Sequence, residues 1–372
     1  MSLMIILLAV ICLAYANGAN DNFKGVATLF GSGTTNYRRA LSWATVTTFL
    51  GSLTALFLAE TLLKSFSGKG LVDASLVQSL NYGAAVALGA GLTVLIATKI
   101  GMPVSTTHGL VGALIGAGLA AGSIINFHQL TGGFFVPLLI SPVVALVLAL
   151  ICYPVLKWTR HRMGVTEETC LCVGNELVEI VPANDQSAMS MRVDALSLEM
   201  GNTVTCQQRY QGRFMGFEAA ALLDRLHFLS AGILCFARGL NDTPKIAALL
   251  LLAPALGKPG GVALVGIVIA LGGIISARKV AETMSNKITT MNHGQGFTAN
   301  VISGFIIIVA SKFGMPVSTT HVSCGALFGI GAATGQGRWR TICTILGAWV
   351  ITLPLGAALG AIAYYCIQAF LK

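Results

Sequence analysis

The sequence predicts an all-α polytopic membrane protein, built as an inverted repeat around two broken helical hairpins. Three observations lead to this fold class. Of the 372 residues, 55% are hydrophobic and only 10% are charged, whereas a soluble globular chain carries roughly 25% charged residues. Long apolar runs recur along the chain. In addition, the octapeptide GMPVSTTH occurs twice, beginning at Gly101 and again at Gly314.

The apolar runs predict membrane-spanning helices. Nearly charge-free examples are 84–97, 136–156, 261–277 and 341–370. At about 20 residues per spanning helix, the chain supplies about 10–12 membrane segments in the lipid bilayer. The first apolar stretch, 3–16, has the length of a signal-peptide core, but it runs directly into a polar motif without a cleavage site. We therefore expect it to be a membrane segment of the mature protein.

Two motifs recur and indicate an internal duplication. Residues 99–108 match residues 312–321 at nine of ten positions. Upstream, the Asn-Asp motif of residues 20–24 is paired with residues 241–245, and each copy ends in a lysine. Two separate motifs that recur in the same order at nearly the same spacing are typical of repeated architecture.

A polar segment separates the two halves. The chain accordingly divides into a first membrane repeat at 1–156, a polar insert at 157–226 and a second membrane repeat at 227–372. The sequence CLCVGNELVEIV, from Cys170, hints at a strand, and 217–228 fits an amphipathic helix that leads back to the bilayer. We expect the insert to have linking or regulatory duties at most.

Loop charge predicts the orientation. Four loops are basic, and they contain Arg38 and Arg39; Lys157, Arg160 and Arg162; Arg278, Lys279 and Lys287; and Arg338 and Arg340. The positive-inside rule places these loops and the insert in the cytoplasm, with both termini outside, in a multi-pass cell (plasma or inner) membrane. All four basic loops lie on the same side of the membrane only if the two halves of the chain are inverted repeats of each other. Orientation also explains the net charge of +9, so we expect no nucleic-acid partner.

The repeated octapeptide predicts an anion site. Gly and Pro end the helix that arrives from upstream, and the Ser-Thr-Thr cluster caps a new one. A helix N-terminus at membrane depth offers free N–H groups and partial positive charge, and the hydroxyls add donors. Two such hairpins that meet near the midplane are typical of the substrate site of a secondary transporter. The hydroxyl residues concerned are Ser105, Thr106, Thr107, Ser318, Thr319 and Thr320.

The Asn-Asp motifs predict a path for a cation or a proton. A carboxylate inside a membrane helix is costly and by default marks such a path. Asp21 and Asp242 each follow an asparagine, Asn20 and Asn241, and each has a lysine three residues later, Lys24 and Lys245. In a helix, residues three apart share a face and can pair.

With these residues in view, the sequence resembles the inorganic phosphate transporter (PiT) family of secondary carriers. The motifs GANDNFKG, LNDTPK and the two copies of PVSTTH carry the resemblance, which covers both membrane halves but leaves out the insert. It implies phosphate held by the hydroxyls of residues 105–107 and 318–320, with the Asn-Asp motifs serving the coupling cation. It implies no enzymatic activity and no cofactor.

One departure from the family pattern concerns the coupling ion. Sodium-coupled members usually carry Asn-Asp-x-x-Asn in both halves, and this chain has Lys24 and Lys245 at the last position. An ammonium group there can occupy the place and charge of a bound Na⁺. We therefore expect protons rather than Na⁺ to drive transport, since a desolvated lysine can itself exchange a proton. The alternative is that the lysines attract the anion or are structural partners of Asp21 and Asp242.

Five further residues are secondary candidates. Lys99 and Lys312 precede the hairpin breaks, where they add positive field for the anion or extend to the interface. His108 and His321 end the motifs and are either proton relays or groups that orient the hydroxyls. Arg238 corresponds to Asn17 in the first half, and it either holds the anion or neutralises Asp242.

The chain has nine cysteines without a regular framework. Those in apolar segments are expected to be packing residues. Cys170, Cys172 and Cys206 lie in the insert, but they lack a zinc-like CxxC pair, so no metal site is expected.

Several other functions compete with a phosphate carrier. A carrier for another tetrahedral oxyanion such as sulfate and a sodium-coupled phosphate symporter remain alternatives. An intramembrane hydrolase with Ser105 or Ser318 and a neighbouring histidine lacks the Gly-x-Ser-x-Gly elbow. A passive anion channel would give gradient-independent flux, and ATP-driven transport lacks a Walker motif. A homo-oligomer is compatible with the sequence, which does not specify the oligomeric state.

Overall fold

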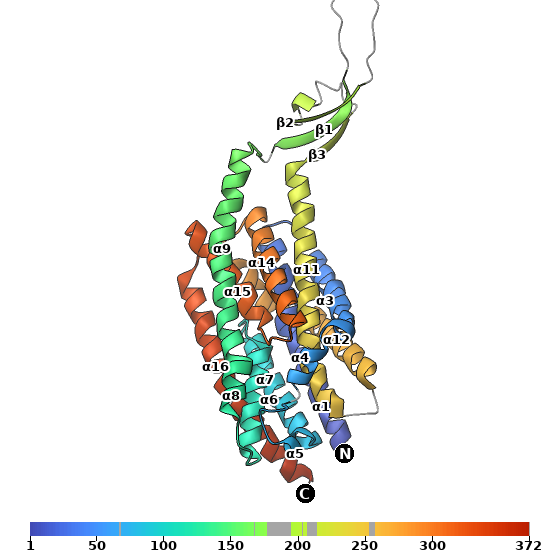
Figure 1. The fold of residues 1–372 in the computed structure, drawn as a ribbon, viewed down its shortest axis with the longest axis vertical. Helices are drawn as coiled ribbons and strands as arrows, with labels where there is room; N and C mark the ends of the chain where they lie inside the picture. The colour runs from blue at the N-terminus through green and yellow to red at the C-terminus, as the bar shows by residue number, and fades with distance from the viewer. Residues whose placement is uncertain are drawn as a thin grey trace, which may run out of the picture. The chain divides into compact units, whose positions relative to one another are not determined.

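The structure is a computed structural model, and it describes residues 1–66, 68–166, 168–176, 195–202, 204–206, 214–252 and 257–371. It consists of two compact units. The first contains Met1–Tyr153 together with His227–Lys372, and the second contains Pro154–Leu226. The larger unit is almost entirely helical (Figure 1).

The first half of the chain folds into helices that alternate between long membrane segments and short turns. In order, they are α1 (Ser2–Asp21), the 3₁₀ turn η1 (Asn22–Val26), α2 (Ala27–Gly31), α3 (Tyr37–Leu58), α4 (Glu60–Ser65), α5 (Ala74–Val77), α6 (Leu80–Lys99), α7 (Thr106–Ala120), α8 (Phe127–Leu130), the π turn η2 (Thr131–Phe135) and α9 (Val136–Arg162).

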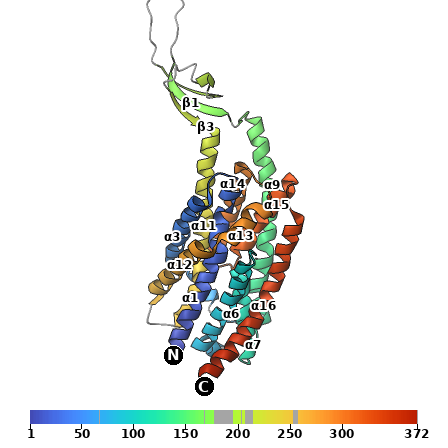
Figure 2. The same ribbon diagram turned by 180° about the vertical axis from the view of Figure 1, so that it is seen from behind.

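The second half repeats this alternation. In order, it contains α11 (Ala219–Ala247), the 3₁₀ turn η3 (Ala248–Leu252), α12 (Gly257–Ser276), α13 (Arg278–Glu282), the π turn η5 (Thr283–Lys287), α14 (His293–Lys312), α15 (Thr319–Thr334) and α16 (Trp339–Leu371). Helix α16 packs along α6 and α7, so the last helix of the second half covers the hairpin of the first (Figure 2).

The smaller unit contains an antiparallel sheet. Its strands are β1 (Thr169–Glu176), β2 (Ala195–Asn202) and β3 (Phe214–Glu218), in the order β2-β1-β3. The strand expected from Cys170 is confirmed as far as Glu176, and residues 177–181 of that prediction lie outside the described residues. The prediction of a helix over 217–228 is wrong at its start, because Phe217 pairs with Leu171 in the sheet and α11 begins at Ala219.

Eight helical segments of the described residues are long and apolar enough to cross a membrane. They are 2–31, 37–58, 80–99, 127–162, 219–251, 257–276, 293–312 and 339–371. The expected count of about 10–12 segments is approached only if α7 and α15 are included, and these have 15 and 16 residues. Many large apolar side chains on the long helices, such as Leu139 and Val350, are exposed. In a bilayer, this apolar surface faces lipid.

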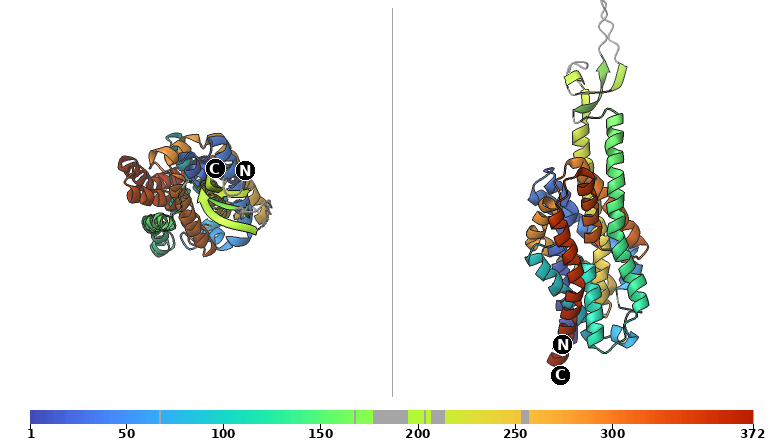
Figure 3. Two further views of the ribbon diagram at one scale, coloured as in Figure 1. Left: turned by 90° about the horizontal axis from the view of Figure 1, so that it is seen from above. Right: turned by 90° about the vertical axis from the view of Figure 1, so that its left-hand side faces the viewer.

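The two chain termini lie at the same end of the larger unit (Figures 1 and 3). Helix α9 carries the chain to the opposite end, and α11 brings it back from there. The first half therefore begins at one end of the unit and the second half begins at the other.

Both GMPVSTTH segments break a helix in the same way. After α6, Gly101 has a φ of +73°, and the N–H of Met102 donates to the Ala97 carbonyl at 2.9 Å. After α14, Gly314 has a φ of +68°, and the equivalent bond joins Met315 to Ala310 at 2.9 Å. This is the Schellman ending, in which glycine takes the left-handed conformation without steric cost. The octapeptide thus stops one helix and repositions the chain to begin the next.

Glycines let the helices of the core approach closely. A Cβ on Gly18 of α1 would lie 1.9 Å from the Ile269 carbonyl oxygen of α12. A Cβ on Gly239 of α11 would lie 2.0 Å from the Thr48 carbonyl oxygen of α3. Small residues at helix crossings are typical of membrane proteins, where packing replaces the hydrophobic effect as the driving force between helices. These contacts fix the walls around the buried polar residues described next.

Candidate functional site

The predicted polar residues converge in the interior of the larger unit. The residues of both Asn-Asp motifs and of both Ser-Thr-Thr clusters that carry these groups are at most 5% exposed: Asn20, Asp21, Lys24, Asn241, Asp242, Lys245, Ser105, Thr106, Thr107, Ser318, Thr319 and Thr320. Buried charges are tolerated only when they are paired and hydrogen bonded. Each of these buried polar groups is therefore expected to have a hydrogen-bonding or charged partner.

The Asn-Asp motif of the first half lies where a helix breaks. Helix α1 ends at Asp21, and the 3₁₀ turn η1 carries Lys24. The expected ion pair is present, since the ammonium of Lys24 contacts Asp21 Oδ1. Lys24 Nζ also donates to Asn20 Oδ1 at 2.7 Å and to the carbonyl of Val104 at 2.9 Å. The lysine is thus held by a cage of oxygen atoms.

The second motif forms a related set of contacts, in which the lysine lies farther from its carboxylate. Helix α11 continues through Pro244 to Ala247, so this motif remains within a helix. Lys245 Nζ lies 3.3 Å from Asp242 Oδ1 and donates to the carbonyl of Val317 at 2.7 Å. Asn241 Nδ2 donates to Asp242 Oδ1 at 3.0 Å. Each lysine therefore joins its own carboxylate to the unwound backbone of a hairpin.

Within each hairpin, the three hydroxyl residues have different contacts. Ser105 and Ser318 are N-caps, and each accepts the N–H of the histidine three residues later at 3.1 Å. Thr106 donates to Asp21 Oδ2 at 2.9 Å, and Thr319 donates to Asp242 Oδ2 at 3.0 Å. The first threonine of each motif thus belongs to the carboxylate of its own half.

The second threonine of each motif binds the lysine of the opposite half. Lys24 Nζ donates to Thr320 Oγ1 at 2.7 Å, and Lys245 Nζ donates to Thr107 Oγ1 at 2.9 Å. Thr320 Oγ1 also lies 2.9 Å from the carbonyl oxygen of Val104. The two hairpins and the two Asn-Asp motifs therefore form one network, in which each lysine donates a hydrogen bond to a threonine of the opposite half.

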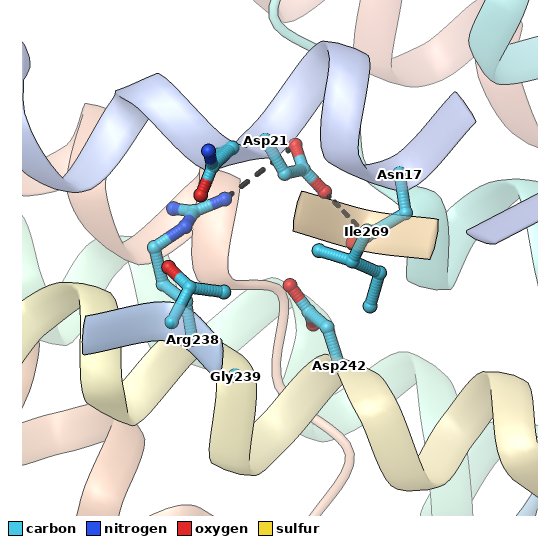
Figure 4. A pocket seen from close by; sticks show the side chains of 8 residues that line it. Asn17, Asp21, Arg238, Gly239, Asp242 and Ile269 are labelled. Atoms are coloured by element: carbon cyan, nitrogen blue, oxygen red, sulfur yellow. Dashed lines mark hydrogen bonds and ion pairs between the residues drawn. The ribbon is translucent and has the colours of Figure 1, made fainter. Parts of the chain in front are cut away.

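Arg238 is the charged group that breaks the symmetry. Its Nη2 atom lies 3.5 Å from Asp21 Oδ1, so it approaches the carboxylate of the other half (Figure 4). The two roles expected for Arg238, holding the anion or neutralising Asp242, stay predictions, and the ion pair that the structure shows for its guanidinium is with Asp21. Arg238 is 2% exposed, and its Nη1 and Nη2 atoms have no hydrogen-bond partner among the described residues.

The two motif histidines lie together beside the network. The rings of His108 and His321 are 4.4 Å apart and perpendicular. His321 stacks on Trp349 at 3.8 Å, and His108 Nδ1 lies 3.4 Å from the Trp349 carbonyl oxygen. His108 thus contacts α16 through a backbone carbonyl, and His321 contacts α16 by ring stacking on Trp349. This packing favours an orienting role for the histidines.

Lys99 and Lys312 lie away from the network. Each ends its helix and is exposed. The backbone carbonyl of Lys99 accepts a hydrogen bond from Lys279 Nζ at 2.9 Å. Their exposure is compatible with side chains that extend to the membrane interface, and whether they also add positive field for the anion stays a prediction.

The sequence analysis missed several groups that complete the network. Asn17 Nδ2 donates to Asp21 Oδ2 at 2.9 Å and lies 3.0 Å from Thr106 Oγ1. Asn20 Nδ2 donates to Thr98 Oγ1 at 2.9 Å, and Ser311 Oγ donates to Asn241 Oδ1 at 3.2 Å. The spacing of four between Asn17 and Asp21 would have indicated the first of these contacts. Thr98 and Ser311 are separated by the same interval as the two octapeptides, so the repeat would have indicated them as a pair.

The cysteines of the smaller unit form a cluster of their own. Cys172 and Cys206 are joined by a disulfide. The sulfur atoms of these two residues and of Cys170 all lie within 4.8 Å of one another, and all three residues are buried. The expectation that these residues hold no metal stays a prediction.

The fold and the buried network define a class of protein. A multi-pass helical membrane protein that encloses hydroxyls, unwound carbonyls and paired charges between two broken hairpins has the construction of a secondary carrier. The family model described as the phosphate transporter family matches residues 17–360. The chain belongs to this family.

Relatives of known name support the assignment. A "Probable low-affinity inorganic phosphate transporter" of Rhizobium meliloti (strain 1021) is 30% identical over 367 residues, which cover 94% of this chain and 92% of the relative. One of the same name from Bacillus subtilis (strain 168) is 29% identical and covers 98% of both chains. Among solved structures, "The sodium-dependent phosphate transporter" aligns with a TM-score of 0.63 at 21% identity over 99% of each chain. At that identity, the likeness shows the shared fold.

Proposed function

We propose that this protein is a secondary active carrier of inorganic phosphate that is coupled to protons and independent of Na⁺. Membership of the phosphate transporter family and the names of the relatives support phosphate as the substrate. In this proposal, phosphate binds between the two hairpins, at the N-termini of α7 and α15, where hydroxyls and free N–H groups gather. The Asn-Asp motifs then serve the coupling ion.

The observation that carries the coupling proposal is the oxygen cage around each lysine. The ammonium of Lys24 contacts a carboxylate, an amide oxygen, a backbone carbonyl and a hydroxyl. These are the ligands that a hard cation such as Na⁺ prefers, and unwound carbonyls at broken helices coordinate coupling ions in carriers. Because Lys24 and Lys245 fill these positions, we infer that their charge replaces that of Na⁺ and that a proton provides the coupling.

A sodium-coupled symporter is the second candidate. The solved structure of similar fold is named as sodium-dependent. In this alternative, the lysines move away to admit Na⁺ or act only as structural partners of the carboxylates. Sulfate remains the alternative substrate, because helix N-termini and hydroxyls bind either anion.

We further propose that the halves are inverted repeats with the termini outside the cell and the insert, with bounds 157–226, inside. The contacts of the two motifs recur in pairs, as in Thr106 to Asp21 and Thr319 to Asp242. The halves also begin at opposite ends of the larger unit (Figure 1), as inversion requires. Loop charge supports the choice of side.

Uptake into proteoliposomes tests the proposal. Phosphate uptake by the full-length protein in Na⁺-free buffer is expected to rise with an imposed inward proton gradient and to be indifferent to added Na⁺. The double variant Lys24→Asn/Lys245→Asn removes both ammonium groups, so its uptake is expected to become Na⁺-dependent. Lys258→Asn is the matched control, because Lys258 pairs with Glu60 in an exposed contact at 3.1 Å. Uptake by the double variant that ignores Na⁺ would contradict the role given to the lysines.

A further inference from the structure

A small cavity beside the network collects polar groups without partners. It is lined by Asn17, Asp21, Asn22, Thr48, Arg238, Gly239, Asp242 and Ile269 (Figure 4). Its free volume of about 10 Å³ leaves room for about one water molecule. Among the buried side-chain atoms that lack a hydrogen bond are Nη1 and Nη2 of Arg238, Oδ1 of Asn22 and Oγ1 of Thr48. Buried polar groups are rarely left unpaired, so this concentration points to a ligand.

The guanidinium of Arg238 lies near Asp21, but its Nη1 and Nη2 atoms form no hydrogen bond with it. Asp21 Oδ1 already contacts the ammonium of Lys24 and accepts from Thr320 Oγ1 at 3.2 Å. The oxygen that Arg238 approaches is therefore already in contact with Lys24 and Thr320. Each of the two carboxylates of the network has a lysine partner, and Arg238 adds one positive charge beyond these two pairs. A guanidinium in this position is suited to an anion, whose oxygens match its fork of donors.

The orientation of the Asn22 amide follows from its other contact. Asn22 Nδ2 lies 2.9 Å from Thr45 Oγ1, and the hydroxyl of Thr45 donates to the Leu41 carbonyl at 2.8 Å. Thr45 has therefore used its proton, so it accepts from Asn22 and fixes the NH₂ group on that side. The free Oδ1 of Asn22 is left as an acceptor toward the cavity.

Thr48 adds a second polar oxygen. Its hydroxyl lines the cavity near the thiol of Cys235, which is only a weak hydrogen-bonding group. The carboxylates of Asp21 and Asp242 also line the cavity, and they too accept hydrogen bonds. The lining thus combines one strong cationic donor, Arg238, with several acceptors. An anion that also carries an acidic O–H satisfies both kinds of group.

We propose that Arg238, Asn22 and Thr48 form a selectivity subsite that recognises a protonated tetrahedral oxyanion. This inference rests on the proposed transport of phosphate and assigns its selectivity. Arg238 binds a charged oxygen of phosphate, and Asn22 Oδ1 and Thr48 Oγ1 face its P–OH group. Sulfate carries no proton at neutral pH, so it would leave the Oδ1 of Asn22 unpaired beside two carboxylates, whereas the Thr48 hydroxyl can donate to either anion. A site built to hydrogen bond a substrate hydroxyl strongly rejects the analogue that lacks it.

The cavity is too small for phosphate in the state described, so the subsite operates when its walls separate. These walls come from α1, η1, α3, α11 and α12, and the close approach of Gly18 and Gly239 keeps them together here. Phosphate enters this subsite when the helices part.

The experiment measures uptake of phosphate, arsenate and sulfate by proteoliposomes under an inward proton gradient. Arsenate carries an acidic hydroxyl as phosphate does, so it should compete with phosphate, whereas sulfate should compete weakly. Asn22→Leu removes the amide acceptor with little change in size, and it is expected to reduce the preference for phosphate over sulfate by about tenfold. Thr48→Val removes a hydroxyl that can bind either anion, so it is expected to raise the KM for both. Thr47→Val is the matched control, since Thr47 lies on the same helix but donates to the Trp43 carbonyl at 2.7 Å.

Arg238 is tested by a series that separates charge from geometry. Arg238→Gln is expected to raise the KM for phosphate by at least about tenfold while proton dependence is retained, and Arg238→Lys should be intermediate because it keeps charge but loses the fork. The subsite is refuted if Arg238→Lys and Thr48→Val both retain the KM of the unaltered protein and Asn22→Leu retains its selectivity. If Arg238→Gln does not fold, these three variants decide the outcome. Failure of the proposed function is distinguishable, since the unaltered protein would then show no phosphate uptake.

Discussion

The Asp21 and Asp242 sites have the same sequence pattern, but they differ in the number of groups that hold the carboxylate. Among the residues that the structure describes, Asp21 contacts donors from five: Lys24, Arg238, Asn17, Thr106 and Thr320. Within the same part of the chain, Asp242 contacts donors from three: Lys245, Asn241 and Thr319. The difference shows that a duplicated motif can yield two sites of unequal strength when one position, Asn17 in one half and Arg238 in the other, diverges.

The two ion pairs also differ in their backbone. Lys24 lies on a 3₁₀ turn directly after α1 has ended, whereas Lys245 lies inside α11. Because Asp21 contacts more donors than Asp242, we expect the first site to be the tighter one, and the predictions below test this ranking.

The largest expected effect is the loss of a carboxylate. Asp21→Asn leaves Lys24 and Arg238 buried without a negative partner, and breaking a buried pair costs about 3–5 kcal/mol. Asp242→Asn leaves only Lys245 without a negative partner, so we expect a smaller loss of stability. Thermal unfolding of the purified protein in detergent measures both. Glu282→Gln is the control, because its pair with Arg278 is exposed and worth about 0–1 kcal/mol. Equal destabilisation by the two aspartate variants would contradict the ranking.

A smaller effect is expected from the hydrogen bonds that cross between the halves. Thr320→Val removes a hydroxyl that contacts Lys24, Asp21 and Val104, and an unsatisfied buried donor costs about 1–3 kcal/mol. Thr107→Val removes fewer contacts and should cost less. Unfolding temperatures and proton-driven uptake are the measurements. Thr344→Val serves as the control, since that exposed hydroxyl donates to the Arg340 carbonyl of its own helix at 2.8 Å. A larger loss of stability or uptake from Thr107→Val than from Thr320→Val would contradict the ranking of the two sites.

The smallest effect is expected at the helix caps, where the halves are alike. Ser105→Ala and Ser318→Ala each remove an N-cap bond of 3.1 Å, and each should cost about 0.5–2 kcal/mol. Because the geometry is the same, the two losses should agree with each other. A clear difference between them would show that the hairpins are not equivalent even where their sequences match.

Much of this protein could be predicted from its sequence. Composition and the long apolar runs predicted a multi-pass helical membrane protein, because so few charges are not typical of a soluble chain and a run of about 20 apolar residues spans the bilayer as a helix. The octapeptides determined the hairpin breaks and the caps, since Gly, Pro and Ser act on the backbone within a few residues. The pairing of Asp21 with Lys24, and of Asp242 with Lys245, followed from a spacing of three.

Only the tertiary structure decided which distant groups meet. The contact of Lys24 with Thr320 joins residues 296 positions apart, and the approach of Arg238 to Asp21 depends on how α1 and α11 cross. The unpartnered atoms of Asn22 and Thr48 likewise have no signature in the sequence, because a missing hydrogen bond depends on every neighbouring helix. The physical reason is that capping and helix breaking are local, whereas a buried charge is satisfied by whichever groups the packing brings to it.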